Sequence, residues 1–282
     1  MNRTIYTFWE PRSNMTPYLS LCMDTWRQHT QGFEHIILDY SNLFEYIPEG
    51  SVNIDKVKHI SLALQKDVIQ ATVLKYNGGI FIDADMIFTG DLNELLAPLT
   101  EYDVVTFSSH LAFMMAKPNA QLINEWYEEV TNRIDLLTVD MQVNWDYFGN
   151  QIVNKKLKNS KYKSLKLDKY ISAFTPEINY YANIGSVMRM YDNFWFSTTI
   201  STSQVFFENQ TIIALHNSWT PQWYKRLSKE EILNHPCLMS RTLKRLTTEG
   251  HPMVHKSETF FNLGVIKISW FVKVLLRKMG VN

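Results

Sequence analysis

Apolar and polar positions alternate in blocks along the chain, and their order predicts an α/β fold. Short apolar runs at Thr4–Trp9, Phe33–Leu38 and Ile80–Ile82 predict strands. The run Ile80–Ile82 is apolar at every position, which is typical of a strand inside a sheet covered on both faces. Between the first two runs, Thr16–His29 predicts a helix that opens with a hydroxyl cap followed by proline. This strand-helix-strand order indicates a Rossmann-type sheet.

The longest helical pattern covers Ile54–Asn77, immediately before the fully apolar strand. Its apolar residues recur every three or four positions and share one helix face. These residues are Val57, Ile60, Leu64, Val68, Ala71 and Leu74. Gly78-Gly79 ends the helix, because glycine tolerates the left-handed conformation of a C-cap. The strand that follows ends in Asp83-Ala84-Asp85, which places two carboxylates one residue apart at its carboxyl end.

Further elements of both kinds are predicted in the rest of the chain. Asp91-Leu92-Asn93-Glu94 fits a capping box and predicts a short helix. Strands are predicted at Asp103–Ser108, Leu111–Ala116 and Thr211–Leu215, and helices at Asn119–Ile134 and Val139–Leu157. The aromatic, loop-rich stretch Lys158–Ser203 predicts irregular structure. We therefore expect one α/β domain over residues 1–255.

Residues 256–282 predict an amphipathic C-terminal helix. From Phe260 to Leu276, 12 of 17 residues are apolar, but Lys267 and Lys273 interrupt a run that is also short for a membrane span. The apolar residues form a stripe, and basic residues lie on the other side. This pattern fits a helix on an anionic membrane surface. It equally fits a terminal helix packed on the protein body or in a dimer interface.

Composition narrows the class of protein. The 282 residues carry 28 basic and 28 acidic side chains, and this balance argues against bulk nucleic-acid binding. The two cysteines, Cys22 and Cys237, lie far apart and predict a reducing compartment rather than a disulfide framework. No signal peptide is visible at the N-terminus. We expect a cytoplasmic protein, with the C-terminal helix as its means of peripheral attachment; the oligomeric state is left open.

The paired carboxylates are the strongest functional signal. Burying them is costly without a compensating cation, and open α/β sheets bind ligands at the carboxyl ends of their strands. A divalent cation would neutralise Asp83 and Asp85 and could hold a phosphate in its remaining positions. Residues one apart on a regular strand face opposite ways, so convergence requires the chain to bend between them. The alternative is a strand end whose carboxylates cap a turn.

The wider unit, Asp67-Val68-Ile69-Gln70 followed by Tyr76–Asp85, resembles the sugar-binding region with the DxD motif in glycosyltransferase family 32 and related capsular polysaccharide synthesis proteins. The resemblance extends to Phe8-Trp9, Leu21–Trp26 and Ser218-Trp219, and covers about residues 3–225. It implies a GT-A-like mixed sheet flanked by helices. It also implies retaining transfer of a hexose from a nucleotide sugar, with a UDP-sugar favoured. The implied acceptor is a lipid-linked glycan or a growing surface polysaccharide.

The resemblance implies a role for each matching residue. Asp85 would be a ligand of Mn²⁺ or Mg²⁺, and Asp83 would contact the ribose or sugar of the donor and reach the metal. His216 or Ser218 would complete the metal shell, and imidazole suits Mn²⁺ better than Mg²⁺. The aromatic rings of Trp9 and Trp219 would pack on the base or cover the diphosphate. Each of these residues also has a purely structural interpretation as a cap, a satisfied histidine or a packed ring.

One departure concerns the helix before the motif. The family usually has an aspartate followed three residues later by arginine, and this chain has Asp67 and Gln70. Glutamine supplies no positive charge, so that role would shift to Lys66 or Arg189, or donor preference would change. A carboxylate that orients sugar hydroxyls is expected nearby. Asp140 and Asp146 are its two candidates.

Two rival functions stay open. Haloacid-dehalogenase-type phosphatases also place Asp-x-Asp after an apolar strand, and here Asp83 would be the nucleophile. Their motif usually lies near the N-terminus, whereas a strand-helix-strand unit and a long helix precede it in this chain. The second rival is a sugar-binding protein that has lost turnover, and Gln70 is its best support.

Overall fold

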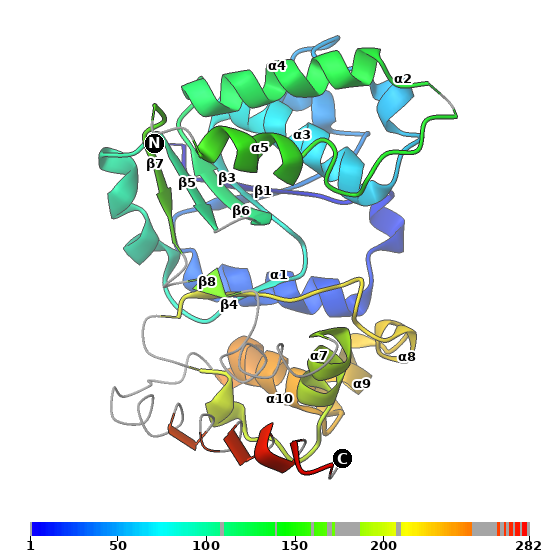
Figure 1. Ribbon diagram of the computed structural model, residues 1–282, viewed down its shortest axis with the longest axis vertical. Coiled ribbons are helices and arrows are strands. Elements are labelled where there is room, and N and C mark those ends of the chain that lie inside the picture. The colour runs from blue at the N-terminus through cyan, green and yellow to red at the C-terminus, as the bar shows by residue number, and fades with distance from the viewer. Residues whose placement is uncertain are drawn as a thin grey trace. The chain divides into compact units, whose positions relative to one another are not determined.

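The computed structural model describes residues 2–107, 110–138, 140–158, 161–167, 171–172, 187–206 and 210–249, with 264–265, 268, 271–272, 274–276 and 278–280. The chain forms two compact units, each assembled from separate segments (Figure 1). The first unit comprises Met1–Met15, Gly32–Ala84 and Asn93–Asp168, and the second comprises Thr16–Gln31, Asp85–Leu92 and Lys169–Asn282. The division into one domain over 1–255 and a tail stays a prediction.

The first unit is built on a six-stranded mixed sheet with the order β2-β1-β3-β6-β5-β7. Its strands are β1 (Thr4–Phe8), β2 (Glu34–Leu38), β3 (Gly79–Ile82), β5 (Val104–Phe107), β6 (His110–Ala116) and β7 (Ser164–Lys166). Strand β1 runs parallel to β2 and β3, whereas β6 runs antiparallel to β3 and β5. All four residues of β3 are buried. The predicted mixed Rossmann-type sheet and its buried strand are confirmed.

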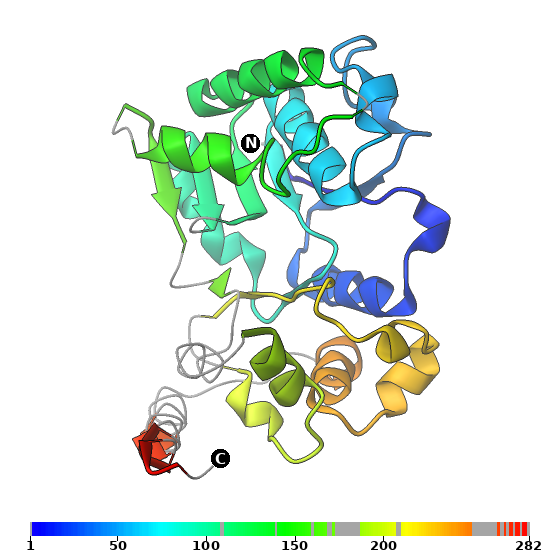
Figure 2. The same ribbon diagram turned by 45° about the vertical axis from the view of Figure 1, so that its right-hand side comes forward.

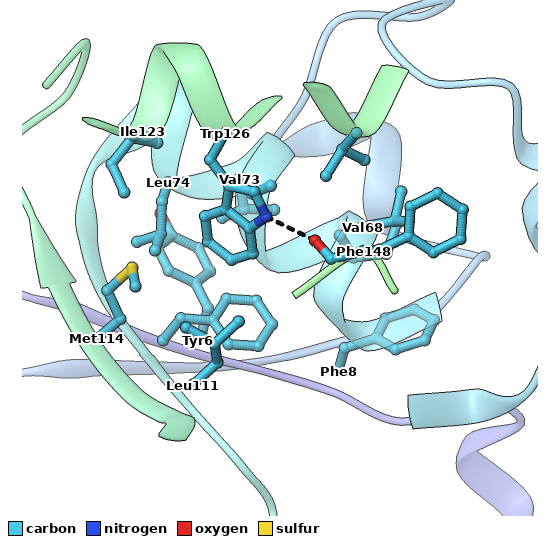
Figure 3. Packing of buried hydrophobic residues seen from close by; sticks show 14 of the residues in the cluster. Tyr6, Phe8, Val68, Val73, Leu74, Leu111, Met114, Ile123, Trp126 and Phe148 are labelled. Atoms are coloured by element: carbon cyan, nitrogen blue, oxygen red, sulfur yellow. Dashed lines mark hydrogen bonds between the residues drawn. The ribbon is translucent and has the colours of Figure 1, made fainter. Parts of the chain in front are cut away.

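Helices of the first unit cover one face of this sheet (Figures 1 and 2). They are α2 (Ile54–Val57), α3 (Leu62–Asn77), α4 (Gln121–Asp135) and α5 (Asn150–Leu157). The unit also has short 3-10 helices at Arg12–Asn14, Leu43–Glu45 and Ala97–Thr100. Phe81, Val68, Trp126 and Phe148 from different segments pack in one buried core (Figure 3). The Trp126 indole Nε1 donates to the Phe148 carbonyl oxygen at 2.6 Å. This bond ties α4 to the chain just before α5.

The prediction of one helix over Ile54–Asn77 is wrong at residues 58–61, which follow its first turn. The chain breaks between α2 and α3, where Ser61 adopts an extended backbone (ψ 150°) as the N-cap of α3. The Gln65 side chain donates to the Ile60 carbonyl oxygen at 2.7 Å, so a side chain takes an acceptor that a continuous helix would use. The predicted end is confirmed, because Gly78 caps α3 with φ +61°. A Cβ there would lie 2.6 Å from Pro118 N.

The predicted helix over Val139–Leu157 is also wrong in its first half. Residues 140–149 form turns and extended chain, and α5 begins only at Asn150. The buried Phe148 side chain and the bond from Trp126 to its carbonyl hold these turns against the core. Apolar spacing alone could not distinguish such a packed loop from a helix.

Glu125 on α4 organises a polar network that joins α4 to the segments around α5 and β7. Its carboxylate accepts from Lys161 Nζ (2.8 Å), Lys156 Nζ (3.3 Å) and the Tyr162 hydroxyl (2.5 Å). These hydrogen bonds, led by those from Lys161 and Tyr162, lower the pKa of Glu125 from 4.5 to about 2. Because the folded pKa is depressed, the carboxylate stabilises the fold above about pH 4.5, and this contribution is lost as the pH falls toward 2.

Replacing Glu125 with glutamine is therefore expected to destabilise the protein in a pH-dependent way. The loss should be about 1 kcal/mol at pH 7, the upper end for exposed ion pairs, and should shrink toward zero as the pH approaches 2. Urea unfolding of wild type and E125Q between pH 2.5 and 7 measures this difference. Glu128, exposed on the same helix, provides the matched control E128Q. An E125Q deficit that stays constant with pH would contradict this role of the charge.

The second unit combines a small sheet with several helices. Its strands are β4 (Met86–Phe88), β8 (Ile171–Ser172) and β9 (Ile212–Ala214), in the order β4-β9-β8. Its helices are α1 (Pro17–His29), α7 (Val187–Trp195), α8 (Gln222–Lys225), α9 (Lys229–Asn234) and α10 (Leu238–Lys244), with a 3-10 helix at Thr202–Gln204 and a π-helix at Arg245–Glu249. A further 3-10 helix covers Leu92–Leu95, where the second unit gives way to the first along the chain, and a short helix is predicted there.

Helix α1 supports β4 through polar contacts. The Trp26 indole Nε1 donates to the Met86 carbonyl oxygen (2.7 Å), and the Thr25 hydroxyl accepts from Phe88 N–H (3.0 Å). The predicted helix start is confirmed, since the Thr16 hydroxyl accepts from Leu19 N–H at 3.4 Å. Strand β4 is absent from the sequence-based prediction, and the predicted last strand lies beside it in this small sheet.

Two predicted regions are described only in part. Within Lys158–Ser203, the irregular structure expected throughout is wrong for β7, β8 and α7, while residues 159–160, 168–170 and 173–186 lie outside the described residues. Much of the predicted tail helix also lies outside them. Its described residues 264–265, 268, 271–272 and 274–276 are helical. Among the described residues, no helix has the length and apolarity that spanning a membrane requires.

Candidate functional site

The carboxyl ends of three parallel strands meet at one edge of the large sheet. Strands β1, β2 and β3 are parallel neighbours, and Trp9, Asp39 and Asp83 follow their last residues. Trp9 N–H donates to the Leu38 carbonyl oxygen at 3.0 Å, which extends the pairing of β1 and β2. This edge is where open α/β sheets bind ligands.

Asp83, at the end of β3, forms an ion pair with Lys66 of α3. Lys66 Nζ lies 3.1 Å from Asp83 Oδ1 and 2.8 Å from Asp67 Oδ1, so one ammonium group joins two carboxylates. The Lys66 and Asp67 side chains are only 15% and 9% exposed, whereas Asp83 is 31% exposed. The cation that compensates Asp67 and Asp83 is therefore a residue of the protein itself, Lys66.

The ion pairs change the acid–base properties of the group. Burial alone would lower the pKa of Lys66, but the charges of Asp67 and Asp83 outweigh it and raise that pKa above its usual range. Burial raises the pKa of Asp67 more than Lys66 lowers it, and the charges of Asp83 and Asp146 raise it further. The two carboxylates therefore favour the charged form of Lys66, whereas burial disfavours the charged form of Asp67.

Gln70 does not take the place of the arginine that the family usually has on this helix, because its side chain does not face outward. It is fully buried, and its Nε2 donates to the Leu111 carbonyl oxygen at 3.0 Å. Its Oε1 accepts from Lys66 Nζ at 3.2 Å. The side chain of Arg189, the other cation considered for this role, lies outside the described residues.

The second oxygen of Asp67 lies against the backbone before α5. A Cβ placed on Gly149 would lie 2.0 Å from Asp67 Oδ2, so only glycine fits. Asp146, three residues earlier, accepts from Gln151 Nε2 at 2.8 Å and acts electrostatically on Asp67. Of the two candidates for a sugar-orienting carboxylate, the structure brings Asp146 to this cluster. Asp140 is exposed and has no described contact with it.

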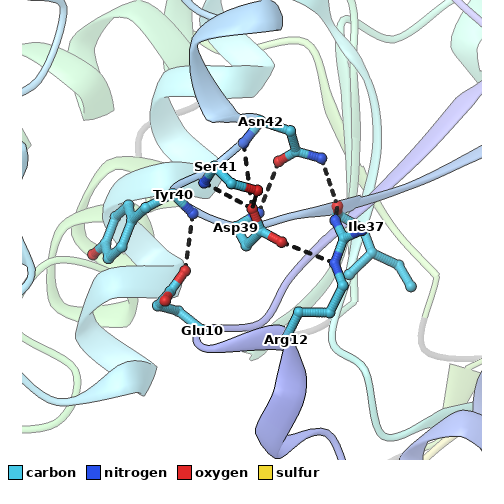
Figure 4. Close-up of polar contacts among 7 residues, drawn as sticks. All are labelled: Glu10, Arg12, Ile37, Asp39, Tyr40, Ser41 and Asn42. Atoms are coloured by element: carbon cyan, nitrogen blue, oxygen red, sulfur yellow. Dashed lines mark hydrogen bonds and ion pairs between the residues drawn. The ribbon is translucent and has the colours of Figure 1, made fainter.

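A second polar cluster joins the loops after β1 and β2 (Figure 4). Asp39 pairs with Arg12 Nε (2.9 Å) and accepts from Ser41 N–H (2.8 Å), while Glu10 accepts from Tyr40 N–H (2.9 Å). Burial tends to raise the pKa of Asp39, but the Ser41 hydrogen bonds and the Arg12 guanidinium hold it below its usual range. The Asp-x-Ser-Asn pattern of an Asx turn is the signal that could have identified this loop. The cluster fixes the loop that carries Trp9.

In the second unit, Asp85 lies against the turn that follows β9. The Asp85 carbonyl oxygen accepts from Leu215 N–H (3.1 Å), and its carboxylate Oδ2 accepts from Asn217 N–H (2.7 Å). These bonds bracket His216, whose ring stacks on Trp219 with centroids 4.0 Å apart. The structure therefore brings Asp85, His216 and Trp219 together, and Ser218 lies exposed on the same turn.

The charge of Asp85 acts on buried groups of its own unit. Burial is the main cause that raises the pKa values of Tyr18 and Cys22 on α1, and the negative charge of Asp85 raises both further. Burial lowers the pKa of Lys225 on α8, and Asp85 opposes that shift. The negative charge of Asp85 thus reaches groups on both α1 and α8.

The described residues allow an open metal site but no closed one. They contain no group of three or more His, Cys, Asp and Glu side chains arranged around a common point. In nucleotide sites, however, one or two carboxylates commonly hold the metal while phosphates and water complete its shell. Asp85 with His216 fits such a partial site. Asp83 differs from Asp85 in that the group on its Oδ1 is the cationic Lys66, whereas Asp85 Oδ2 accepts from the neutral Asn217 N–H.

The fold is that of an α/β protein with acidic residues at the carboxyl ends of its parallel strands. Residues 1–220 match the family described as capsular polysaccharide synthesis protein, and the chain belongs to that family. The match confirms the resemblance inferred from the Asp-x-Asp unit. The comparison with curated protein sequences gave no match.

Solved glycosyltransferase structures are distantly similar to the chain. The apo form of GlyE from Streptococcus pneumoniae TIGR4 has 14% identity and a TM-score of 0.48, covering 97% of this chain and 64% of that one. The PaToxG glycosyltransferase has 13% identity and a TM-score of 0.40, covering 88% and 87%. The galactosyltransferase LgtC, in complex with donor and acceptor sugar analogs, has 9% identity and a TM-score of 0.41, covering 90% and 98%. The chain thus spans 64% of the GlyE chain.

Proposed function

We propose that this protein is a metal-dependent, retaining glycosyltransferase that moves a hexose from a UDP-sugar to a growing capsular polysaccharide or its lipid-linked precursor. The observation that carries the proposal is the acidic cluster of Asp67, Lys66 and Asp83 at the carboxyl end of β3, in a member of a capsular polysaccharide synthesis family. Carboxylates at this edge accept hydrogen bonds from sugar hydroxyls, and family membership favours a glycan product.

Residues of the two units would bind different parts of the donor and the metal. In the first unit, Asp83 and Asp67 accept hydrogen bonds from donor hydroxyls, Asp146 orients them, and Trp9 packs against the donor. In the second unit, Asp85 and His216, with Ser218 beside them, would hold Mn²⁺ or Mg²⁺, and Trp219 would cover the diphosphate. When bound, the metal supplies positive charge that stabilises the leaving diphosphate.

Retention follows from a front-face exchange. The bond between the anomeric carbon and the diphosphate oxygen breaks, and the acceptor oxygen forms a bond to that carbon on the same face. The acceptor's proton passes to the leaving phosphate oxygen, so no separate protein base is needed. The chain's own contribution is to position the two substrates and to stabilise the charges.

Lys66 affects the balance between this function and its rivals. Gln70 supported a protein that binds sugar without turnover, because it left the site without a cation. Lys66 places a cation beside these carboxylates, and this weakens the argument. In a phosphatase, one oxygen of Asp83 would be the nucleophile. Because Lys66 lies on Asp83 Oδ1, the nucleophile would have to be the other oxygen. Attachment of residues 256–282 to an anionic membrane stays a prediction.

A thermal-shift screen of UDP-, GDP- and CMP-sugars, with and without Mn²⁺, tests the proposal. One UDP-sugar should raise the melting temperature only when Mn²⁺ is present. The stabilisation should reach about 2.7 kcal/mol at a donor concentration one hundred times its Kd. UDP alone, Mn²⁺ alone and free hexose are the controls. The donor so identified is then incubated with a lipid-linked or capsular glycan acceptor, and mass spectrometry measures the added hexose.

Two outcomes would overturn the proposal. One is the absence of stabilisation by any nucleotide sugar with Mn²⁺. The other is rapid phosphate release from a generic phosphate ester with Mg²⁺, which would favour the phosphatase. Donor binding without transfer to any acceptor would favour the non-catalytic rival.

A further inference from the structure

The Lys66 ammonium group lies close to more oxygen atoms than is usual for a lysine on the protein surface. Its ammonium group has three N–H donors, and three oxygens lie within reach: Asp67 Oδ1, Asp83 Oδ1 and Gln70 Oε1, at 2.8, 3.1 and 3.2 Å. Gln70 is itself fixed by its bond to the Leu111 carbonyl oxygen. The ammonium position is therefore set by α3 and β3 together with a backbone group near β6.

The glutamine at position 70 matches this arrangement chemically. An amide can donate to a backbone carbonyl with its nitrogen and accept from an ammonium with its oxygen. A cationic side chain at position 70 would instead place a second positive charge beside Lys66. Gln70 and Lys66 thus form a matched pair in which the lysine carries the charge and the glutamine orients it.

The Asp83 carboxylate keeps one oxygen for a ligand. Two carboxylates and one ammonium leave a net charge of −1 on the cluster of Asp67, Asp83 and Lys66. Asp83 Oδ1 is buried on the lysine side, while the side chain as a whole is 31% exposed. Its Oδ2 is therefore the oxygen that a ligand can reach. A neutral hydroxyl can donate to it, whereas the ammonium a few ångströms away offsets much of its attraction for a divalent cation.

We propose that Lys66 is a specificity-determining, positioning residue that keeps divalent metal out of the Asp67–Asp83 pair and holds the Asp83 carboxylate as an acceptor for a hydroxyl group of the donor sugar. The inference rests on the proposed function for the identity of the ligand as a sugar. Its statement about metal does not, because it concerns only charges within the first unit.

Counting bound Mn²⁺ without any donor tests the metal statement. Electron paramagnetic resonance of free Mn²⁺ gives the number of bound ions for wild type, D83N, K66R and K66M. We expect D83N and K66R to bind as many ions as wild type. K66M should bind one more, since it exposes two uncompensated carboxylates, and the double variant K66M/D83N should lose that extra ion. K117M, which removes a lysine paired with Asp103 in the same unit, is the matched control.

The results separate this inference from the proposed function. If K66M folds but binds no extra Mn²⁺, or if D83N loses the wild-type Mn²⁺, the role of Lys66 is refuted even when sugar transfer is observed. If K66M does not fold, the D83N and K66R counts decide alone. With the donor found in the screen, D83N should raise the KM for donor at least tenfold and K66R should largely retain the wild-type KM. Failure to find any donor would overturn the sugar assignment and leave the Mn²⁺ counts standing.

Discussion

Replacing Gly149 with alanine is expected to destabilise the protein by about 3 kcal/mol, at the upper end for forced overpacking. The added Cβ would lie 2.0 Å from Asp67 Oδ2, 2.6 Å from Asp67 Cγ and 2.8 Å from Leu111 Cδ1. This close approach of the Cβ to the Asp67 carboxylate is the cause of the expected loss. Asp67 cannot move away easily, because Lys66 holds its other oxygen.

Urea unfolding monitored by tryptophan fluorescence measures this loss. Gly264→Ala is the matched control, since a Cβ there meets nothing within 4 Å, and its effect should stay within about 0.5 kcal/mol. The double variant D67A/G149A should recover part of the loss, because removing the carboxylate makes room and the two changes are not additive. An unfolding midpoint of G149A equal to that of wild type would refute the close contact between Gly149 and Asp67.

The sequence predicts best what depends on neighbours along the chain. The buried strand β3, the glycine cap at Gly78 and the hydroxyl cap at Thr16 each follow from a few adjacent residues, and the structure confirms them. The break before α3 was missed, although its cause is also local. Apolar spacing continues across Ser61, whereas the competing bond from Gln65 to the Ile60 carbonyl depends on where a side chain points.

What the sequence could not predict depends on contacts between distant segments. Strand β4 has only three residues and forms because β9 pairs with it across more than 120 residues. The bond from Asn217 N–H to the Asp85 carboxylate spans a similar distance. Lys66 was considered from its position in the sequence, but only the fold shows that it reaches Asp83 on another element. The sequence around Gly149 does not indicate that glycine is required there, because the space for a side chain is taken by the distant Asp67.

Replacing Asp85 with asparagine is expected to abolish most sugar transfer while leaving the fold intact. Asparagine keeps one oxygen that can accept from Asn217 N–H, so the turn carrying His216 and Trp219 should stay in place. It removes the negative charge that the proposed metal requires. Losing this electrostatic contribution should lower the transfer rate by about a hundredfold or more, or about 3 kcal/mol in transition-state stabilisation.

Two measurements on D85N separate charge from structure. Its Mn²⁺ affinity should fall at least tenfold, and its thermal stability without metal should match that of wild type. Asp24→Asn, which removes a carboxylate paired with Lys229 on the same unit, is the control and should keep full activity. Asp85→Ala should lose both metal binding and stability, because it also deprives Asn217 N–H of its acceptor, and an unpaired buried donor costs about 1–3 kcal/mol. If D85N bound Mn²⁺ like wild type and transferred sugar at a comparable rate, Asp85 would be a structural cap for the 216–220 turn. The metal would then have to be held elsewhere.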